Sequence, residues 1–209
     1  MKTYHKIDTL YQRDVKGTKK LIEGAFRNKT VEFLKDNLWS FTEKIDGTNI
    51  RIHWDGHTVE FKGRTDQAKI PTKLLNYLTE TFGTTEVEEL FEQQFGDSDV
   101  ILFGEGYGAG IQKGGAYRND VSFILFDDLI NDVYLTRDAI EDIAKCFGID
   151  IVPVIFLGTI QTAVDFVKTK PQSTIGTANM EGLVGKPLIE LKDRLGKRIV
   201  VKIKACDFE

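Results

Sequence analysis

A β-hairpin is the feature that most constrains how this chain can fold. Ile50, Ile52 and Trp54 alternate with polar residues, as in a strand with one buried face. The Asp-Gly pair at 55–56 comes next, and such a pair favours a tight turn between two antiparallel strands. Residues 58–62 then provide the returning strand, so the sequence predicts a sheet that contains this hairpin.

The remaining periodic segments divide between strands and short helices. The segment 41–52 is predicted as strand, tight turn and strand, and further strands are expected at 100–103, 121–126, 184 and 199–203. Apolar residues at helical spacing predict helices at 71–82, 86–95, 136–147 and 162–170, with Gly148 and Pro171 ending the last two. We therefore expect an α+β fold dominated by sheet.

Length and composition are those of an ordinary globular protein. The 209 residues are enough to bury a core, and no repeat, low-complexity stretch or linker interrupts them. One domain over residues 1–209 is therefore expected. No apolar run approaches the ~20 residues of a membrane span, and the polar N-terminus does not resemble a secretory signal. These features favour a cytoplasmic protein that does not interact with membranes.

The charge balance sets limits on the partners of the chain. A formal net charge of −4 argues against a protein that coats nucleic acid, because nonspecific affinity comes mostly from phosphate neutralisation. Basic residues do concentrate between Lys186 and Lys204, although acidic residues interrupt them. This distribution is compatible with a local basic groove rather than a basic surface.

The first candidate catalytic residue lies in the string Glu-Lys-Ile-Asp-Gly-Thr-Asn at 43–49. Here Lys44 lies at the end of a predicted strand and precedes a turn containing Asp and Gly. A lysine is nucleophilic only when neutral, and burial or nearby cations favour that form. The string by itself is short enough to arise by chance in a surface turn, so the residues that follow decide its meaning.

Downstream, several reactive side chains fall at the ends of predicted strands. Arg64 follows the hairpin, where its guanidinium could bind a phosphate through two hydrogen bonds. Glu105 lies in a glycine-rich loop after the strand at 100–103, and Phe126 ends the strand at 121–126.

The last two motifs supply a further carboxylate and a pair of cations. Glu181 precedes the strand expected at 184. Lys202 and Lys204 are two residues apart on one strand, so their side chains share a face. Two ammonium groups facing one direction are better suited to a polyphosphate than to a protein core.

This ordered series resembles the covalent nucleotidyltransferase superfamily of ATP-dependent DNA and RNA ligases and mRNA capping enzymes. Within it, 43–49 and the Gly-Ile-Gln-Lys string at 110–113 are most similar to bacteriophage RNA ligases and trypanosome RNA-editing ligases. The opening residues 7–14 also resemble those of phage RNA ligases, and for a phage protein the cytoplasm would be that of the host. The resemblance covers nearly the whole chain and implies an adenylation domain with an ATP-grasp-like fold, antiparallel sheets flanked by helices.

The resemblance also implies roles for single residues. Lys44 matches the nucleophile that carries AMP, and Glu181 matches the glutamate near the catalytic metal. Lys202 and Lys204 match the pair that binds the α-phosphate.

The other matching residues are implied to bind the nucleotide. Asn49 matches an asparagine that contacts metal and phosphate, and Glu43 belongs to the same motif and is assigned to nucleotide binding. Arg64 matches an arginine that contacts phosphate. Glu105 matches the glutamate that binds the ribose, and Phe126 the aromatic that stacks on adenine.

The implied reaction has three steps and uses ATP with Mg²⁺ or Mn²⁺. Lys44 takes AMP from ATP, AMP passes to a 5′-phosphate end, and a 3′-hydroxyl attacks that end and releases AMP. Such chemistry depends mainly on positioning and charge neutralisation. The expected partner is a nucleic acid with 5′-phosphate and 3′-hydroxyl ends, RNA rather than DNA.

Other interpretations of the same residues are a DNA nick-sealing ligase, an mRNA guanylyltransferase and a non-catalytic nucleotide-binding module with a ligase fold. Two further motifs are excluded. The Gly-x-Gly-x-x-Ala string at 104–109 precedes more glycines rather than the helix of a Rossmann site, and no Gly-Lys-Ser/Thr of a P-loop is present.

The sequence departs from the family in one respect. Only five residues follow Lys204, whereas most relatives continue into an OB-fold or a helical domain. We therefore expect a chain without that second domain. Three alternatives follow: a partner protein supplies the missing surface, the chain is a minimal ligase, or it self-adenylylates but seals poorly.

Overall fold

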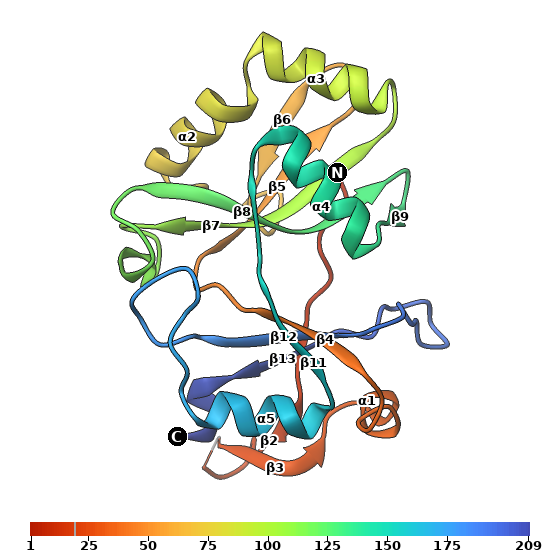
Figure 1. Ribbon diagram of the computed structural model, residues 1–209, viewed down its shortest axis with the longest axis vertical. Helices are drawn as coiled ribbons and strands as arrows, with labels where there is room; N and C mark the ends of the chain where they lie inside the picture. Colours follow the sequence, from red (N-terminus) through yellow and green to blue (C-terminus); the bar gives the residue numbers. More distant parts are fainter. Residues whose placement is uncertain (19) are drawn as a thin grey trace. The chain divides into compact units, whose positions relative to one another are not determined.

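The structure is a computed structural model that describes residues 1–18 and 20–209. It divides into two compact units (Figure 1). Unit 1 comprises residues 1–5 and 46–152, and unit 2 comprises residues 6–45 and 153–209. Among the helices of the described residues, none is long and apolar enough to cross a membrane.

Unit 1 is built on a six-stranded sheet. Along its main path the strand order is β10-β8-β7-β5-β6, and β9 pairs with β8. The strands are β5 (Thr48–Trp54), β6 (Val59–Lys62), β7 (Val100–Gly108), β8 (Val121–Ile130), β9 (Val133–Tyr134) and β10 (Asp150–Ile151). All of these pairs are antiparallel except β10 with β8.

The two faces of the unit 1 sheet are covered differently. One face packs against the helices α2 (Thr72–Phe82), α3 (Thr85–Phe95) and α4 (Arg137–Phe147). Their buried residues join Ile50, Ile52 and Trp54 of β5, the apolar positions of the predicted hairpin. On the other face, Tyr4 packs against Phe103, so the N-terminal residues cover part of it.

Unit 2 contains a five-stranded sheet of order β1-β13-β12-β4-β11. Its strands are β1 (Asp8–Thr9), β4 (Trp39–Glu43), β11 (Val154–Gly158), β12 (Gly182–Pro187) and β13 (Val201–Lys204). Helix α5 (Ile160–Lys168) packs on one face against β12 and β13 (Figure 1). The short helix α1 (Lys29–Phe33) and a two-stranded sheet of β2 (Tyr11–Arg13) and β3 (Leu21–Phe26) complete the unit, with the 3₁₀ turn η2 (Ala205–Phe208) at its end.

The predicted α+β class is confirmed, and most elements occur where the pattern placed them. The hairpin of β5 and β6 pairs Trp54 with Val59 around the Asp-Gly turn. Helix α4 ends at Gly148, whose φ of 64° is left-handed as expected for a C-cap. The prediction of one nucleotidyltransferase domain stays a prediction, since compact units and domains need not coincide.

Several local predictions differ from the structure. Strands β7 and β8 continue past the predicted ends at 103 and 126, so Glu105 lies within β7 rather than in a loop, and Phe126 lies within β8. The strands expected within 41–52 are present as β4 and β5, but they belong to different sheets. Periodicity identifies strands without naming their partners. Helix α5 begins at Ile160 rather than Thr162 because the side chain of Thr159 caps it and accepts from the N–H of Thr162.

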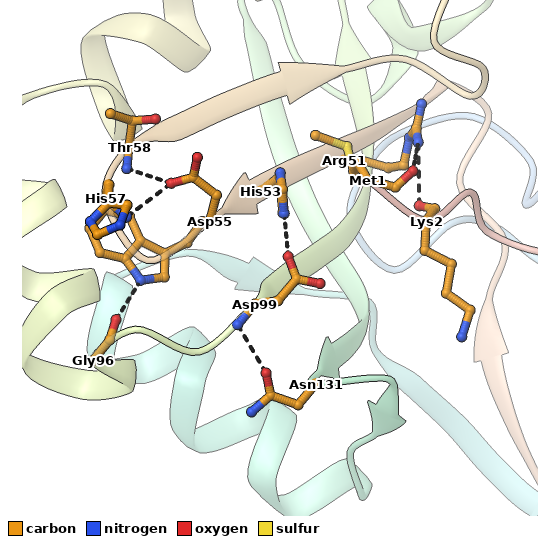
Figure 2. A network of polar contacts seen from close by, with 11 residues as sticks. Met1, Lys2, Arg51, His53, Asp55, His57, Thr58, Gly96, Asp99 and Asn131 are labelled. Carbon is orange, nitrogen blue, oxygen red and sulfur yellow. Dashed lines mark hydrogen bonds and ion pairs between the residues drawn. The ribbon is translucent and has the colours of Figure 1, made fainter.

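A fully buried arginine in the middle of β5 connects the unit 1 sheet to neighbouring segments (Figure 2). Arg51 donates from Nε to the carbonyl of Gly63 at 2.9 Å and from Nη2 to Asp66 at 2.8 Å. Its Nη1 reaches the carbonyl oxygens of Met1 and Lys2 at 3.4 and 3.3 Å. The hydrogen bond and charge of Arg51 lower the pKa of Asp66. One side chain therefore anchors both the N-terminal residues and the turn at 63–66.

We predict that Arg51→Met lowers the free energy of unfolding by about 3 kcal/mol, because it removes charged hydrogen bonds to the carbonyl of buried Gly63 and to those of Met1 and Lys2. Urea unfolding measures the change. The matched control is Lys62→Met, the cross-strand neighbour of Arg51, which should cost under ~1 kcal/mol. Equal stabilities of the two variants would contradict an anchoring role.

Candidate active site

Lys44 follows the last residue of β4 and is held by the sheet of unit 2. Its N–H donates to the carbonyl of Gly182 at 2.9 Å, which extends the pairing of β4 with β12 by one residue. The side chain is 23% exposed, enough for a ligand to reach the amine.

Glu181 forms the centre of a cluster of charges around Lys44. Its Oε2 lies 2.6 Å from Nζ of Lys44, and its Oε1 lies 2.7 Å from Nζ of Lys204. The N–H of Ala205 donates to the Glu181 carbonyl at 2.9 Å, which holds the backbone of this residue. One carboxylate therefore bridges two ammonium groups, and the three side chains are all less than one-third exposed.

The electrostatics of the cluster favour the charged form of Lys204. Burial disfavours that form, but the hydrogen bond and the negative charge of Glu181 outweigh it and raise the pKa of Lys204. Lys204 is therefore a stable positive charge at this site.

The register of the unit 2 sheet places a third lysine, Lys202, on the same face as Lys204. Lys202 pairs with Val184, and Val184 pairs with Thr42, so these three side chains lie on one face. Lys202 and Lys204 share that face, as their spacing predicts, while Val201 and Ile203 are buried in the core on the other. Lys186 is two residues beyond Val184 and lies on the lysine-bearing face.

Unit 1 brings together two of the residues assigned to the nucleotide. Asn49 on β5 lies directly opposite Glu105 on β7. Facing residues of an antiparallel pair project to the same side of the sheet. The Oδ1 atom of Asn49 is buried and has no hydrogen-bond partner among the residues that the structure describes. Because a buried carbonyl oxygen seldom lacks a partner, this atom is suited to a ligand or an ion.

Phe126 shares the face of Glu105, because Ile124 pairs with Glu105 and Phe126 lies two residues further along β8. Gly104 pairs with Leu125 and Phe103 with Asp127, so Phe126 is the extra residue of a β-bulge. Its ring packs with Phe103 and lies edge-on to Tyr4 at a centroid distance of 5.1 Å. The ring of Phe126 is thus partly buried, with Tyr4 as its aromatic neighbour.

Arg64 is exposed in the turn after β6. Arg51 forms hydrogen bonds with Gly63 and Asp66, which lie on either side of Arg64 in the chain. Among the described residues no ion pair or hydrogen bond is recorded for the Arg64 side chain. The guanidinium therefore stays available for a ligand.

Glu43 is placed differently from the other site residues. Its side chain faces the core of unit 2 and is only 1% exposed. The carboxylate accepts hydrogen bonds from Ser173 and Thr174. Contacts within the protein thus occupy the group that the sequence assigned to nucleotide binding.

A contact that sequence analysis did not find supports the turn after Lys44. The N–H of Asp46 donates to the hydroxyl of Tyr117 at 3.2 Å. Tyr117 belongs to the glycine-rich loop after β7, and its ring packs edge-on to Tyr107. No local pattern links positions this far apart, so only the tertiary fold reveals the contact.

Comparison with protein families identifies the chain. The model of the RNA ligase family matches residues 37–204, which include every residue of the candidate site. This chain belongs to the RNA ligase family. A search of curated proteins finds no match.

Solved structures of RNA ligase from Naegleria gruberi share the fold. A variant with ATP and Mn superposes with a TM-score of 0.64 at 19% identity, over 84% of this chain and 51% of that one. An apo variant gives 0.65 at 18% identity, over 86% and 53%. The structure with PPi gives 0.63 at 20% identity, over 84% and 52%. This family member thus spans about half the length of those structures.

The approach of β12 to β13 in this RNA ligase family member depends on Gly182. Its φ is 153°, and an added Cβ would lie 2.0 Å from the carbonyl oxygen of Ile203. We predict that Gly182→Ala lowers the free energy of unfolding by more than ~3 kcal/mol, from steric overlap and backbone strain. The control Gly110→Ala also has a positive φ, of 85°, but meets nothing within 4 Å, and should cost about 1–2 kcal/mol. Urea unfolding measures both, and equal costs would contradict the role of the close approach.

The ion pair of Lys204 with Glu181 should appear as a pH dependence of stability. A lysine whose pKa is raised by folding contributes stability that is complete below its unfolded pKa of 10.5 and disappears as pH rises through the folded pKa. The difference in unfolding free energy between wild type and Lys204→Met should therefore shrink above about pH 10.5. The control Lys145→Met, on the exposed face of α4, should show no such change. A difference that is constant with pH would exclude the linkage.

Proposed function

We propose that this chain is an ATP-dependent RNA ligase that forms a lysyl-AMP intermediate on Lys44. The observation that carries the proposal is the carboxylate of Glu181 between the ammonium groups of Lys44 and Lys204. A carboxylate held between two cations supports our placement of the α-phosphate beside the same two cations. Membership of the RNA ligase family favours RNA over DNA as the substrate.

In the first step, Nζ of Lys44 loses its proton and attacks the α-phosphorus of ATP. A phosphorus–nitrogen bond forms while the bond to the bridging oxygen breaks, and pyrophosphate leaves. Lys202 and Lys204 would neutralise charge on the α-phosphate, as such cations do in phosphoryl transfer. The ion pair with Glu181 keeps the Lys44 amine in place but must separate before attack, because a protonated amine has no free electron pair.

The two later steps transfer and release AMP. An oxygen of the RNA 5′-phosphate attacks the same phosphorus, and the bond to Lys44 breaks. A 3′-hydroxyl then attacks the activated 5′-phosphate, forms the phosphodiester and releases AMP. We assign Glu105 to the ribose of the nucleotide, Phe126 to the adenine ring and Arg64 to phosphate.

The residues present are compatible with a divalent metal, Mg²⁺ or Mn²⁺. Within residues 1–18 and 20–209 no group of three or more His, Cys, Asp and Glu could hold an ion alone. Mg²⁺ commonly uses one or two carboxylates together with substrate phosphates, a role that suits Glu181 of unit 2. In unit 1, the unpartnered Oδ1 of Asn49 is by itself suited to an ion. Such an ion would neutralise phosphate charge. The Naegleria gruberi structures with ATP or AMP and Mn support this assignment by analogy.

The basic face of unit 2 is the surface that we propose for RNA phosphates. It carries Lys186 beside Lys202 and Lys204. The net charge of −4 gives the chain little general attraction to RNA. We therefore expect a partner protein to raise the efficiency of sealing.

The intact mass of the protein after incubation with Mg²⁺ and ATP tests the first step. Wild type should gain one AMP, Lys44→Ala none, and Lys204→Ala should react about 10²- to 10³-fold more slowly. Lys29→Ala, an exposed lysine of α1 in the same unit, is the control and should react like wild type. A wild type that gains no AMP, and that was not adenylylated as purified, would point to a non-catalytic nucleotide-binding module.

The choice of nucleotide and polynucleotide needs a second assay. α-Labelled ATP should label the protein and α-labelled GTP should not. The adenylylated protein should then seal nicks with RNA ends that carry a 3′-hydroxyl and a 5′-phosphate. Sealing of DNA nicks alone would replace the RNA ligase proposal with a DNA ligase.

A further inference from the structure

Glu43 is a buried carboxylate that the proposed chemistry does not use. It is the last residue of β4 and pairs with Leu183 of β12, on the face packed in the core of unit 2. Its Oε1 accepts from the hydroxyl of Ser173 at 2.5 Å. Its Oε2 accepts from the N–H of Thr174 at 2.9 Å and from the hydroxyl of Thr174 at 2.5 Å.

These hydrogen bonds explain how a charge can be buried here. An ionised carboxylate without partners is very costly to bury, whereas short charge-assisted hydrogen bonds offset that cost. All three donors come from two consecutive residues, Ser173 and Thr174. Glu43 is therefore bonded to one short segment rather than to its surroundings in general.

That segment belongs to the first arm of a small hairpin, residues 172–179, which is followed by Met180 and Glu181. Gln172 and Asn179 form a bridge, and the N–H of Ser173 donates to the carbonyl of Ala178 at 2.9 Å. At its base the N–H of Met180 donates to the carbonyl of Pro171 at 2.8 Å. A movement of this hairpin would be transmitted to Glu181 through a single intervening residue.

The nucleophile and this anchor are adjacent in the chain. Successive residues at a strand end project to opposite sides, so Glu43 faces the core while Lys44 faces Glu181. One strand end thus fixes both the lysine and the hairpin that presents its carboxylate partner.

We propose that Glu43 is a positioning residue that holds the hairpin 172–179 and thereby sets Glu181 against Lys44. This role differs from the contact with the nucleotide that the sequence assigned to Glu43. It rests on the proposed function, since it concerns the formation of lysyl-AMP. A displacement of about 1 Å at a reacting group can cost on the order of 100-fold in rate, so a remote anchor can matter to the chemistry.

A double-mutant cycle tests the anchor. Glu43→Gln, Thr174→Val and the double variant are compared with wild type in single-turnover formation of lysyl-AMP at saturating ATP. Each single variant should slow the reaction about 10- to 100-fold, and the double variant should be no slower than the slower single one. The affinity for ATP should change by less than about threefold, since the loss affects positioning rather than binding. Rates that multiply in the double variant would overturn the proposal.

A nucleotide analogue separates positioning from contact with the base. Purine riboside triphosphate lacks the 6-amino group of ATP. Under the proposal, Glu43→Gln slows ATP and the analogue by the same factor, and the preference for ATP over GTP stays as in wild type. A loss of either preference would show that Glu43 contacts the base and would exclude a purely positioning role.

Controls distinguish the anchor from general damage. Thr174→Ser keeps the hydroxyl and should retain a rate close to wild type, and Glu60→Gln on β6 replaces an exposed glutamate and should have no effect.

If wild type itself gains no AMP, the proposed function fails. The same four proteins of the cycle then test the anchor by urea unfolding, where additive losses of stability would exclude coupling between Glu43 and Thr174.

Discussion

The arrangement of unit 2 depends on the pairing of β12 with strands on both of its sides. Pairing with β4 brings Gly182 to the backbone of Lys44, and pairing with β13 brings it opposite Lys204. Glu181, one residue earlier, is thereby placed where it reaches both ammonium groups. A carboxylate between two cations is stable only when all three side chains are held at short distance, and the backbone hydrogen bonds of the sheet provide that restraint.

The same sheet separates charged from apolar side chains by alternation. Leu183, Val201 and Ile203 face α5 and the core, while Lys202 and Lys204 face the other side. A lysine face of this kind tolerates its own repulsion because Glu181 neutralises part of it and solvent reaches the rest. It is also the arrangement that a polyphosphate requires, since the cations are present before the ligand arrives.

Unit 1 uses its sheet in a comparable way. The face under the helices is apolar, and the opposite face carries Asn49, Glu105 and Phe126. Placing polar side chains on strands rather than on mobile loops fixes their directions. Arg51, in the middle of β5, and the N-terminal residues complete this face, so the sequence before unit 2 contributes to unit 1 (Figure 2).

Family membership and the likeness to solved ligases agree with a set of candidate site residues drawn from both units. The matched residues 37–204 span both units, and they contain the lysine, the carboxylates and the aromatic residue that the motifs indicate. With identities near 20%, the likeness to the Naegleria gruberi structures concerns the fold. The site chemistry is therefore argued from the side chains of this chain.

The sequence by itself determined the hairpin of β5 and β6, most of the longer strands, the four longer helices, the class of fold and the order of the motifs. These follow from local rules, because alternation, turn pairs and capping residues act over a few positions. It also placed Lys202 and Lys204 on one face, since spacing along a strand fixes direction. It did not indicate α1 or the strands β1 to β3 and β9 to β11. Only the tertiary structure decided that β4 and β5 enter different sheets and that Phe126 sits in a bulge. It also decided that Glu43 is held by Ser173 and Thr174 and that Arg51 reaches Met1 and Lys2. Each of these depends on residues 49 to 131 positions apart, or on the choice of strand partner, and no local pattern encodes such contacts.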